Sequence, residues 1–253
     1  MKKQLVSIII PVYNASKYLE ETITTIEEQT YENWEAIFVD DCSNDNSKKI
    51  IENSIKKDKR IKLLTNDKNS GAAVTRNNGI NYSNGEYICF LDADDKWNKQ
   101  KLEKQIKFMD DLDCAFSYTA YQFCNDKCLP TGKRVSVPES ITYKQALKNT
   151  TIWTSTVMFN MKKLTKEDIK MPNVKRGQDT ATWWKVLRTK VPKAYGINEI
   201  LSYYRRDVNT LSSNKLKALK RTWNLYRKVE HLNIINSVYN FCWYCFNAVR
   251  RRV

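Results

Sequence analysis

The first half of the chain alternates continuous apolar runs with amphipathic stretches, and this alternation restricts the folds open to it. The run "LVSIIIPVY" (5–13) is typical of a strand that is covered on both faces. It is followed by Leu19, Ile23 and Ile26, which recur at i, i+4 and i+7 and so share one face of a helix. Strands that alternate with helices of this length predict βαβ units, and therefore an α/β fold with a mainly parallel central sheet and flanking helices.

The same alternation continues to about residue 120 and then becomes less regular. Further strands are expected at 34–40, 61–64, 87–91 and 114–118, and further helices around 50–55, 71–80 and 102–109. In the second half we expect a β-rich segment at 151–160, a helix at 178–188, a strand at 200–206 and helical structure from about 214 onward. A chain of 253 residues has room for one substantial domain and a small appendage.

Acidic clusters follow two of the expected strands directly. The strand ends are "PVYN" (11–14), "DDCSND" (40–45) and "DADD" (92–95). In open α/β sheets ligands bind beyond the carboxyl ends of the strands, so these segments are expected to form one site. The chain has no G-x-G-x-x-G after its first strand and no G-x-x-x-x-G-K-[ST], which argues against a dinucleotide-dependent dehydrogenase and a P-loop enzyme.

Three carboxylates, Asp92, Asp94 and Asp95, come straight after an apolar strand. They could cap the helix expected after them and suit its dipole. A cap accounts for one aspartate, or two at most, whereas a divalent cation accounts for all three. Mg²⁺ and Mn²⁺ prefer oxygen ligands and are often held by one or two carboxylates together with substrate phosphates. The sequence therefore favours a Mn²⁺ or Mg²⁺ site bound to a phosphorylated ligand.

The chain is strongly basic, with 43 Lys and Arg against 28 Asp and Glu, a net charge of +15. Residues 215–253 contain nine Lys or Arg and one acid, Glu230, which gives +8 (9 − 1). Apolar residues recur there at spacings of three and four, as in an amphipathic helix: Leu232, Ile235, Tyr239, Cys242, Phe246 and Val249. This tail could pack on its own domain or on a second copy in a homodimer, lie on an anionic membrane, or bind nucleic acid.

The cysteines indicate reduced thiols rather than disulfides or a zinc site. The seven are odd in number and scattered, and the one histidine, His231, is far along the chain from Cys124 and Cys128. The sequence shows no secretory signal and no apolar run of the roughly 18 residues that a membrane span needs. We therefore expect a cytoplasmic protein.

Several motifs in combination resemble the family 2 glycosyltransferases. They are "VSIIIPVYNASKYLEETITTIEEQTYENWEAIFVDDCSNDNS", "NSGAAVTRNNGI" and "GEYICFLDADD", in this order and at about this spacing. The resemblance is close over residues 5 to about 120 and looser to about 212. It implies a GT-A (Rossmann-like) fold, a nucleotide-sugar donor, a divalent cation and inversion at the anomeric carbon.

The resemblance also implies roles for individual residues of the donor site. Pro11 to Tyr13 would lie against the nucleotide base, and Asp41 would read the imide edge of uracil. Arg76 would contact the nucleotide, Asp92 the ribose side and Asp94 the metal. Asp95 also matches the family's acidic run. Only Asp41 argues for UDP, and dTDP and GDP stay open.

The resemblance places the catalytic base on a carboxylate that opens a helix in the second half. "GQDTATWWKVL" matches, so Asp179 is the candidate, and a simple helix cap is the alternative. Gln178 stands where the family more often has an acid. Arg205 and Ser212 match a loop that closes over the diphosphate. Acceptor-side residues are expected at Trp153, Thr154 and Ser155, with an ordinary edge strand as the alternative.

The sequence thus predicts a metal-dependent inverting glycosyltransferase that acts on a glycan or lipid-linked acceptor at the inner face of the membrane. Residues 1–212 would form the catalytic domain, with a nucleotide-sugar-binding half (1–120) and an acceptor half (121–212). Residues 213–253 would form a basic helical tail that binds anionic membrane and no nucleic acid. A nucleotidyltransferase and a non-catalytic binder of anionic lipid or nucleic acid are the alternatives.

Overall fold

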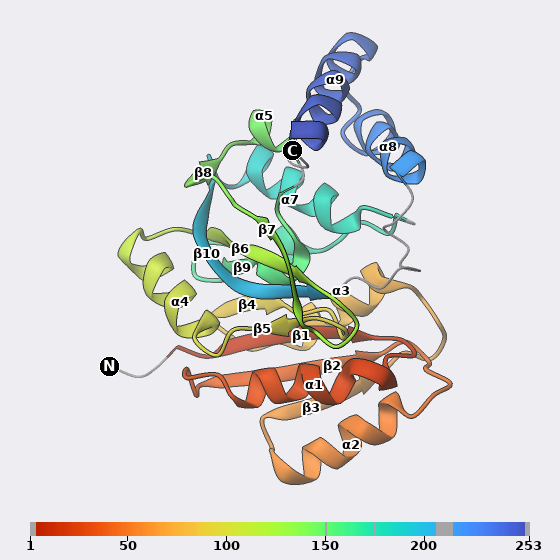
Figure 1. Ribbon diagram of the computed structural model, residues 1–253, viewed down its shortest axis with the longest axis vertical. Helices are drawn as coiled ribbons and strands as arrows, with labels where there is room; N and C mark the ends of the chain where they lie inside the picture. Colours follow the sequence, from red (N-terminus) through yellow and green to blue (C-terminus); the bar gives the residue numbers. More distant parts are fainter. Residues whose placement is uncertain (1–3, 150, 175, 206–214, 251–253) are drawn as a thin grey trace.

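The computed structural model describes residues 4–149, 151–174, 176–205 and 215–250. It is a mixed α/β fold built on one twisted sheet with helices on both faces (Figure 1). The strands are β1 (Val6–Val12), β2 (Trp34–Asp40), β3 (Ile61–Thr65), β4 (Tyr87–Phe90), β5 (Lys96–Trp97), β6 (Phe116–Cys124), β7 (Pro130–Val135), β8 (Ser140–Ile141), β9 (Met158–Asn160) and β10 (Ala194–Arg205).

The helices alternate with strands up to about residue 111 and dominate the end of the chain. They are α1 (Ser16–Glu27), α2 (Ser47–Lys57), α3 (Ala72–Tyr82), α4 (Lys101–Asp111), α5 (Tyr143–Ala146), α6 (Lys166–Ile169), α7 (Gln178–Thr189), α8 (Lys215–Asn224) and α9 (Ile234–Arg250). A short 3₁₀-helix, η1 (Thr154–Thr156), precedes β9, and a π-helix, η2 (Leu225–Val229), continues α8.

The sheet order is β3-β2-β1-β4-β9-β6-β10-β5, with β7 beside β6 and β8 beside β10. The four strands β3, β2, β1 and β4 are parallel, as the sequence predicts. The antiparallel strand β9 separates β4 from β6, and β10 runs parallel to β6. The chain therefore moves outward from β1 in both directions, and this reversal lies between β1 and β4. Such a switch point is where open α/β sheets bind ligands.

Two apolar cores lie on the two faces of the sheet, because side chains alternate along each strand. On β1, Ile8 and Ile10 belong to the core under α1, α2 and α4, whereas Ile9 belongs to the core under α3 and α7. Helix α3 approaches the sheet closely at Gly79, where an added Cβ would lie 2.6 Å from a methyl of Ile9. This packing sets the position of Arg76 on α3 relative to the strand ends.

Three local expectations differ from the structure. Segment 151–160 is not continuous β-structure, because a 3₁₀ turn precedes the short strand β9. The interpretation of Asp92, Asp94 and Asp95 as a helix cap is wrong, since β5 intervenes and α4 begins at Lys101 with Gln100 at its N-cap. The expected strand at 114–118 begins at Phe116 and continues to Cys124. The short elements β7, β8, α5 and α6 carry no periodic pattern and are not expected from the sequence.

The C-terminal helices pack on the core that contains α7 (Figure 1). Leu225 and Tyr226 of η2 are buried in it, and the Tyr226 ring stacks on Trp184 at 5.3 Å between centroids. Helix α9 has two different faces. Ser237, Asn240 and Tyr244 are buried, whereas the side chains Ile235, Val238, Tyr239, Trp243 and Phe246 are exposed. The described part of the chain has no helix that is both long and apolar enough to span a bilayer.

Candidate active site

Most of the predicted donor-site residues lie at the carboxyl ends of β1, β2, β4 and β10, around the switch point, whereas Arg76 comes from α3 and Asp179 from α7. Pro11 is half-buried in β1, and Tyr13 beyond it is 52% exposed. The loops after β1 and β2 are joined, because the Asn14 amide donates to Ser43 Oγ at 3.0 Å and the Asn44 amide donates to Asn14 Oδ1 at 2.8 Å. This edge therefore presents an exposed ring on a fixed pair of loops.

Arg76 and Asp92, both predicted as donor contacts, form an ion pair. A guanidinium nitrogen of Arg76 donates to Asp92 Oδ1 at 2.5 Å, and the side chains are 7% and 20% exposed. Arg76 Nε is buried and has no partner within the described residues. The pair joins α3 to the end of β4, and one buried guanidinium donor remains unsatisfied there.

Asp94, the next carboxylate, differs from Asp92 in its surroundings. None of the other described residues forms a hydrogen bond or an ion pair with it, although its backbone oxygen accepts from Arg205 Nε at 2.8 Å. Burial, followed by the charge of Asp92, raises the pKa of Asp94 to about 6. A partly buried carboxylate beside a second one is costly unless a cation neutralises it.

The donor set fits a divalent cation that relies on its substrate for further ligands. No group of three or more His, Cys, Asp or Glu side chains in the described ranges is arranged to hold a metal by itself. Asp94, with Asp92 beside it, supplies one or two oxygens, which is the number that Mg²⁺ commonly takes from protein when phosphates complete its shell. The residues therefore match a metal–diphosphate site better than a preformed metal cage.

Asp95 has a structural environment that sequence reasoning missed. It is 1% exposed. Its Oδ2 accepts from Ser155 Oγ at 2.6 Å and from Trp153 Nε1 at 3.0 Å, and its Oδ1 accepts from the Arg205 amide at 3.1 Å. Burial raises its pKa well above the ordinary value, with the charges of Asp94 and Asp92 adding to the shift. Asp95 thus ties together the ends of β4 and β10 and the turn η1.

Arg205 binds the backbone of the acidic segment, through Asp94. It is 1% exposed, stacks over the Tyr18 ring at 4.3 Å and donates to Glu21 Oε2 at 2.9 Å. Its remaining terminal nitrogen contacts the backbone oxygen of Asp126. All three of its guanidinium nitrogens are therefore engaged with protein, which supports a positioning role. Contact between Arg205 and a diphosphate stays a prediction, and Ser212 lies outside the described residues.

Asp41 is also buried, at 3% exposed. Its Oδ1 accepts from Asn66 Nδ2 at 2.7 Å and from the Ser70 amide at 2.8 Å, and its Oδ2 accepts from the Gly71 amide at 2.8 Å. These bonds fix the loop that leads into α3 and so support the position of Arg76. The predicted contact between Asp41 and uracil would have to use the remaining acceptor capacity of Oδ2.

The predicted base and the predicted acceptor segment meet in the structure. Asp179 is the second residue of α7 and is half-buried. Its Oδ2 accepts from Thr154 Oγ1 at 3.1 Å, and its Oδ1 accepts from the Thr180 amide at 2.7 Å. Trp153 and Ser155 on either side of Thr154 bind Asp95. The alternative of an ordinary edge strand for residues 153–155 is wrong, because η1 is a turn that links the two aspartates.

An aromatic cluster borders this turn, and no pattern in the sequence predicts it. Trp153 lies 4.2 Å from Tyr204 between ring centroids, and Tyr121 and Phe123 pack against the same pair. These residues come from three separate segments, the residue before η1, β6 and β10, so only the sheet order brings them together. Trp153, Phe123 and Tyr204 are half-exposed, and such aromatic rings beside a polar site are typical of ligand pockets.

Comparisons with known proteins agree with this arrangement. Residues 7–171 match the model of the Glycosyl transferase family 2. The chain is 45% identical over 251 residues to the putative teichuronic acid biosynthesis glycosyltransferase TuaG of Bacillus subtilis, covering 99% of this chain and 98% of that one. It is 40% identical over 226 residues to the UDP-Glc:alpha-D-GlcNAc-diphosphoundecaprenol beta-1,3-glucosyltransferase WfgD of Escherichia coli, covering 89% and 86%.

Solved structures show the same fold at low sequence identity. TarS of S. aureus in complex with UDP-GlcNAc superimposes with a TM-score of 0.70 at 21% identity, over 95% of this chain and 71% of that one. The mannosyltransferase PcManGT of Pyrobaculum calidifontis in complex with GDP-Man and Mn²⁺ gives 0.67 at 18% identity, over 89% and 63%. The fold is therefore GT-A, and with the family match over most of its length the chain belongs to glycosyl transferase family 2 and is a glycosyltransferase.

Proposed function

We propose that the protein transfers a sugar, with inversion, from a nucleoside diphosphate donor to a hydroxyl of a lipid-linked glycan, and that it uses a divalent cation. The observation that carries this proposal is the Asp94 carboxylate at the switch point, which no other described residue pairs with and which lies next to the Arg76–Asp92 pair. Arg76 and Arg205 offset only part of the negative charge at this edge, because the pKa of Asp94 stays raised, and a cation with its phosphate ligand would offset the rest.

The donor would lie across the ends of β1 and β4. Tyr13 is exposed and offers its ring to the base, Asp41 lies at the end of β2, and Arg76 and Asp92 would contact the nucleoside side of the diphosphate. Asp94 would hold the Mn²⁺ or Mg²⁺, which offsets the charge of the departing diphosphate. The relationship to a UDP-glucose-dependent enzyme and to a fold neighbour in complex with UDP-GlcNAc supports UDP as the nucleotide.

Asp179 would act as the base, from the opposite side of the sugar. In an inverting transfer the acceptor hydroxyl attacks the anomeric carbon while its proton passes to a carboxylate. Asp179 Oδ2 already accepts one hydroxyl hydrogen bond, from Thr154, so its orientation suits such a donor. Trp153 and the neighbouring aromatic rings would form the acceptor side of the site.

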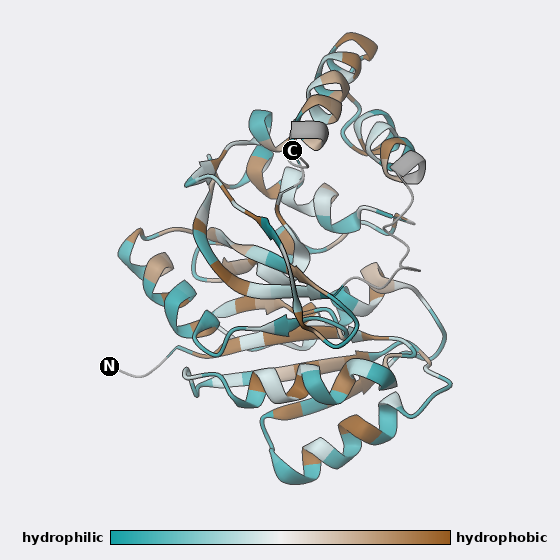
Figure 2. Cartoon of the chain, viewed as in Figure 1, coloured by the Kyte–Doolittle hydropathy of each residue, from teal (hydrophilic) through white to brown (hydrophobic). Residues whose placement is uncertain are grey.

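The acceptor proposed here is a glycan linked through diphosphate to a lipid, because the relative WfgD is named as an enzyme that acts on a diphosphoundecaprenol-linked sugar. Helix α9 supports placement at the inner face of the membrane. Figure 2 shows hydrophobic residues along α9, and its exposed face carries Tyr239, Trp243 and Phe246. We keep the division into a catalytic domain (1–212) and a membrane-binding tail (213–253), with η2 packed on the catalytic core.

Calorimetric titration with UDP, with and without Mn²⁺, tests the donor site. We expect binding to the wild type that a chelator removes, and loss of the metal-dependent part in Asp94→Asn. Asp111→Asn, an exposed change on α4 with the same loss of charge, is the matched control and should bind like the wild type. Metal-dependent binding that persists in Asp94→Asn would refute the assignment of Asp94. A wild type that binds none of UDP, GDP and dTDP would refute the donor site itself.

A further inference from the structure

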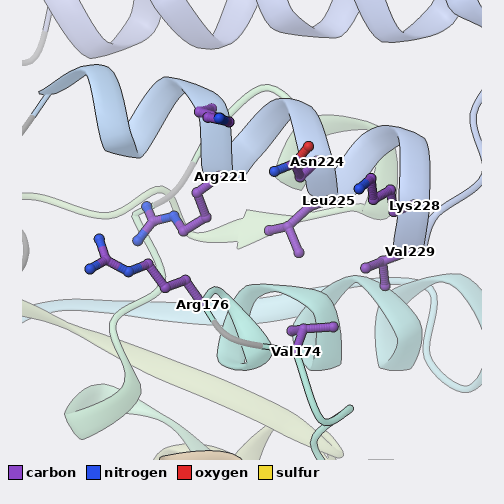
Figure 3. A pocket seen from close by; sticks show the side chains of 8 residues that line it. Val174, Arg176, Arg221, Asn224, Leu225, Lys228 and Val229 are labelled. Carbon is purple, nitrogen blue, oxygen red and sulfur yellow. The ribbon is translucent and has the colours of Figure 1, made fainter.

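A cavity of about 390 Å³ lies outside the donor site, between the loop before α7 and the helices α8 and η2 (Figure 3). This volume is within the roughly 300–1,000 Å³ of small-molecule sites. Val174, Leu225 and Val229 form an apolar wall. The other described lining residues are four cations and Asn224. The proposed nucleotide-sugar site gives these cations no role.

Among the residues that the structure describes, four cations and no Asp or Glu line this pocket: Arg176, Lys220, Arg221 and Lys228. None of the four forms an ion pair with a carboxylate among the described residues, and Arg221 Nε is buried without a hydrogen-bond partner. Figure 3 shows the side chains of Arg176 and Arg221 at the same end of the pocket. Uncompensated like charges at a concave surface raise the local potential and favour an anionic ligand.

The pocket lies against the start of the helix that carries the proposed base. Gly177, the N-cap of α7, has a φ of 81°, and a Cβ there would lie 2.8 Å from Leu225 Cδ1 and 3.3 Å from Arg221 Cδ. Arg176 precedes it directly, and Asp179 follows two residues later. An anion in the pocket would therefore lie near the positive end of α7 and within about one helical turn of Asp179 along the chain.

We propose that this pocket binds the diphosphate of the acceptor, and so selects acceptors whose first sugar is linked to a lipid through diphosphate. The proposal rests on the proposed function. It needs two separate diphosphate sites, one at Asp94 for the donor and one here for the acceptor. Guanidinium groups suit phosphate oxygens, the lysines add charge, and the apolar wall accepts the first part of a lipid chain. Helix α9, whose exposed face is apolar, packs against α8 and η2, which line the pocket, so a lipid chain held on α9 would extend toward it.

Direct binding of inorganic diphosphate in the presence of a chelator tests the pocket without any catalysis. The double variant Arg176→Gln/Lys228→Gln changes two exposed side chains and should weaken binding by about tenfold or more. Lys56→Gln/Lys57→Gln on α2 removes the same charge far from the pocket and should bind like the wild type. Arg221→Lys keeps the charge but loses the guanidinium group, so its affinity for diphosphate should lie between those of the two double variants. Equal binding by the pocket variant and the α2 control would overturn the proposal.

Transfer kinetics then separate the acceptor from other phosphates. With a short-chain lipid diphosphate sugar, the pocket variant should raise the acceptor KM about tenfold while UDP affinity stays unchanged. The same sugar on an uncharged alkyl group should show no difference between variant and wild type. If the pocket variant instead keeps its acceptor KM and loses only its binding to anionic vesicles, the pocket binds lipid headgroups and the proposal fails. Diphosphate binding that depends on the pocket, in a protein that transfers no sugar, would contradict the proposed function and leave this site standing.

Discussion

Asp92, Asp94 and Asp95 lie within four residues of one another but have three different environments. Asp92 pairs with Arg76, Asp94 has no partner among the described residues, and Asp95 accepts three hydrogen bonds from protein. The same residue type therefore serves as a proposed metal ligand (Asp94), an ion-pair partner (Asp92) and a buried structural acceptor (Asp95). Their roles differ because each carboxylate lies against a different neighbouring element.

Asp179→Asn should abolish transfer and leave donor binding intact, because it removes the proton acceptor and nearly preserves shape. General base catalysis contributes roughly 10²–10⁴-fold, so we expect kcat to fall by that factor. Initial rates of sugar transfer measure the loss, and titration with UDP and Mn²⁺ checks the donor site. Thr154→Val removes the hydroxyl that donates to Asp179 and should reduce the rate far less. A near-normal rate for Asp179→Asn would show that Asp179 is a helix cap only.

The turn η1 is an element whose role depends on one hydroxyl. Ser155 Oγ donates to Asp95 and accepts from the Asp92 amide at 3.1 Å, and the serine side chain is buried. Ser155→Ala leaves both groups short of a partner, which costs about 1–3 kcal/mol in the free energy of unfolding. Urea denaturation measures this loss. Ser54→Ala on α2 is the matched control and should cost nothing, and equal stability of the two variants would contradict this role.

Helix α4 begins with a fully buried lysine, Lys101, whose Nζ donates to Gln105 Oε1 at 2.6 Å and lies 4.2 Å from the Trp97 ring centre. Burial lowers the pKa of Lys101 to about 8, against about 10.4 in an unfolded chain. Between these values the native state has released the proton and the unfolded state still holds it. Because the unfolded state then binds more protons, the contribution of Lys101 to the free energy of unfolding rises with pH over this window.

Lys101→Met should remove this pH dependence, since it keeps an unbranched apolar stem without the charge. We expect the variant to have a larger free energy of unfolding than the wild type at pH 7. This difference between the two proteins should narrow as the pH approaches 10. Thermal unfolding of the two proteins at pH 7, 8, 9 and 10 gives the difference, in which the other titrating groups cancel. A gap that stays constant with pH would mean that Lys101 keeps an ordinary pKa in the fold.

Helices and strands whose apolar residues recur at regular spacing could be predicted from the sequence. Elements that are fixed by contacts with distant parts of the chain could not. The strand at 34–40 and the helix around Leu19, Ile23 and Ile26 were correctly predicted, because their own apolar residues define a face. The turn η1 was not, since residues 154–156 are held by Asp95 and Asp179 from elsewhere in the chain. Strand β5 has two residues and exists only through its pairing with β10.

At the scale of the whole molecule, the strand order decides which candidate residues meet. Parallel strands after βαβ units predicted that the ends of β1, β2 and β4 would share one edge, and they do. The inserted antiparallel strand β9, which brings η1 and β10 to the same edge, has no signal in the sequence. The cationic pocket also joins residues about fifty positions apart, Arg176 and Lys228. The net charge of the chain predicted an anionic partner, but it could not predict that four of the cations would line one pocket.

Of the apolar residues that recur in the predicted tail helix, Ile235, Tyr239, Cys242 and Phe246 are exposed, whereas Leu232 packs against the core. Ile235, Tyr239 and Phe246 are 77%, 53% and 57% exposed, while Tyr244 on the other side of α9 packs inward. One face of α9 therefore packs on its own domain, which is one of the expected arrangements, and binding of the exposed face to a membrane or to a second copy stays a prediction. Removing the helix would uncover the core beneath it, so single side chains give a cleaner test of membrane binding than truncation.

Ile235→Ser/Phe246→Ser should release the protein from vesicles that contain anionic lipid and leave UDP binding unchanged. Two such side chains, even partly inserted in the interface, contribute roughly 2–4 kcal/mol, so partitioning should fall at least tenfold in a sedimentation assay. Leu112→Ser/Tyr82→Ser removes an exposed aliphatic and an exposed aromatic side chain elsewhere and should bind like the wild type. If the α9 variant binds vesicles normally but a concentration-dependent dimer disappears in analytical ultracentrifugation, the exposed face is a contact between two copies. In that case the lipid-linked acceptor would not reach the protein along α9, because a face buried between subunits cannot lie on a bilayer.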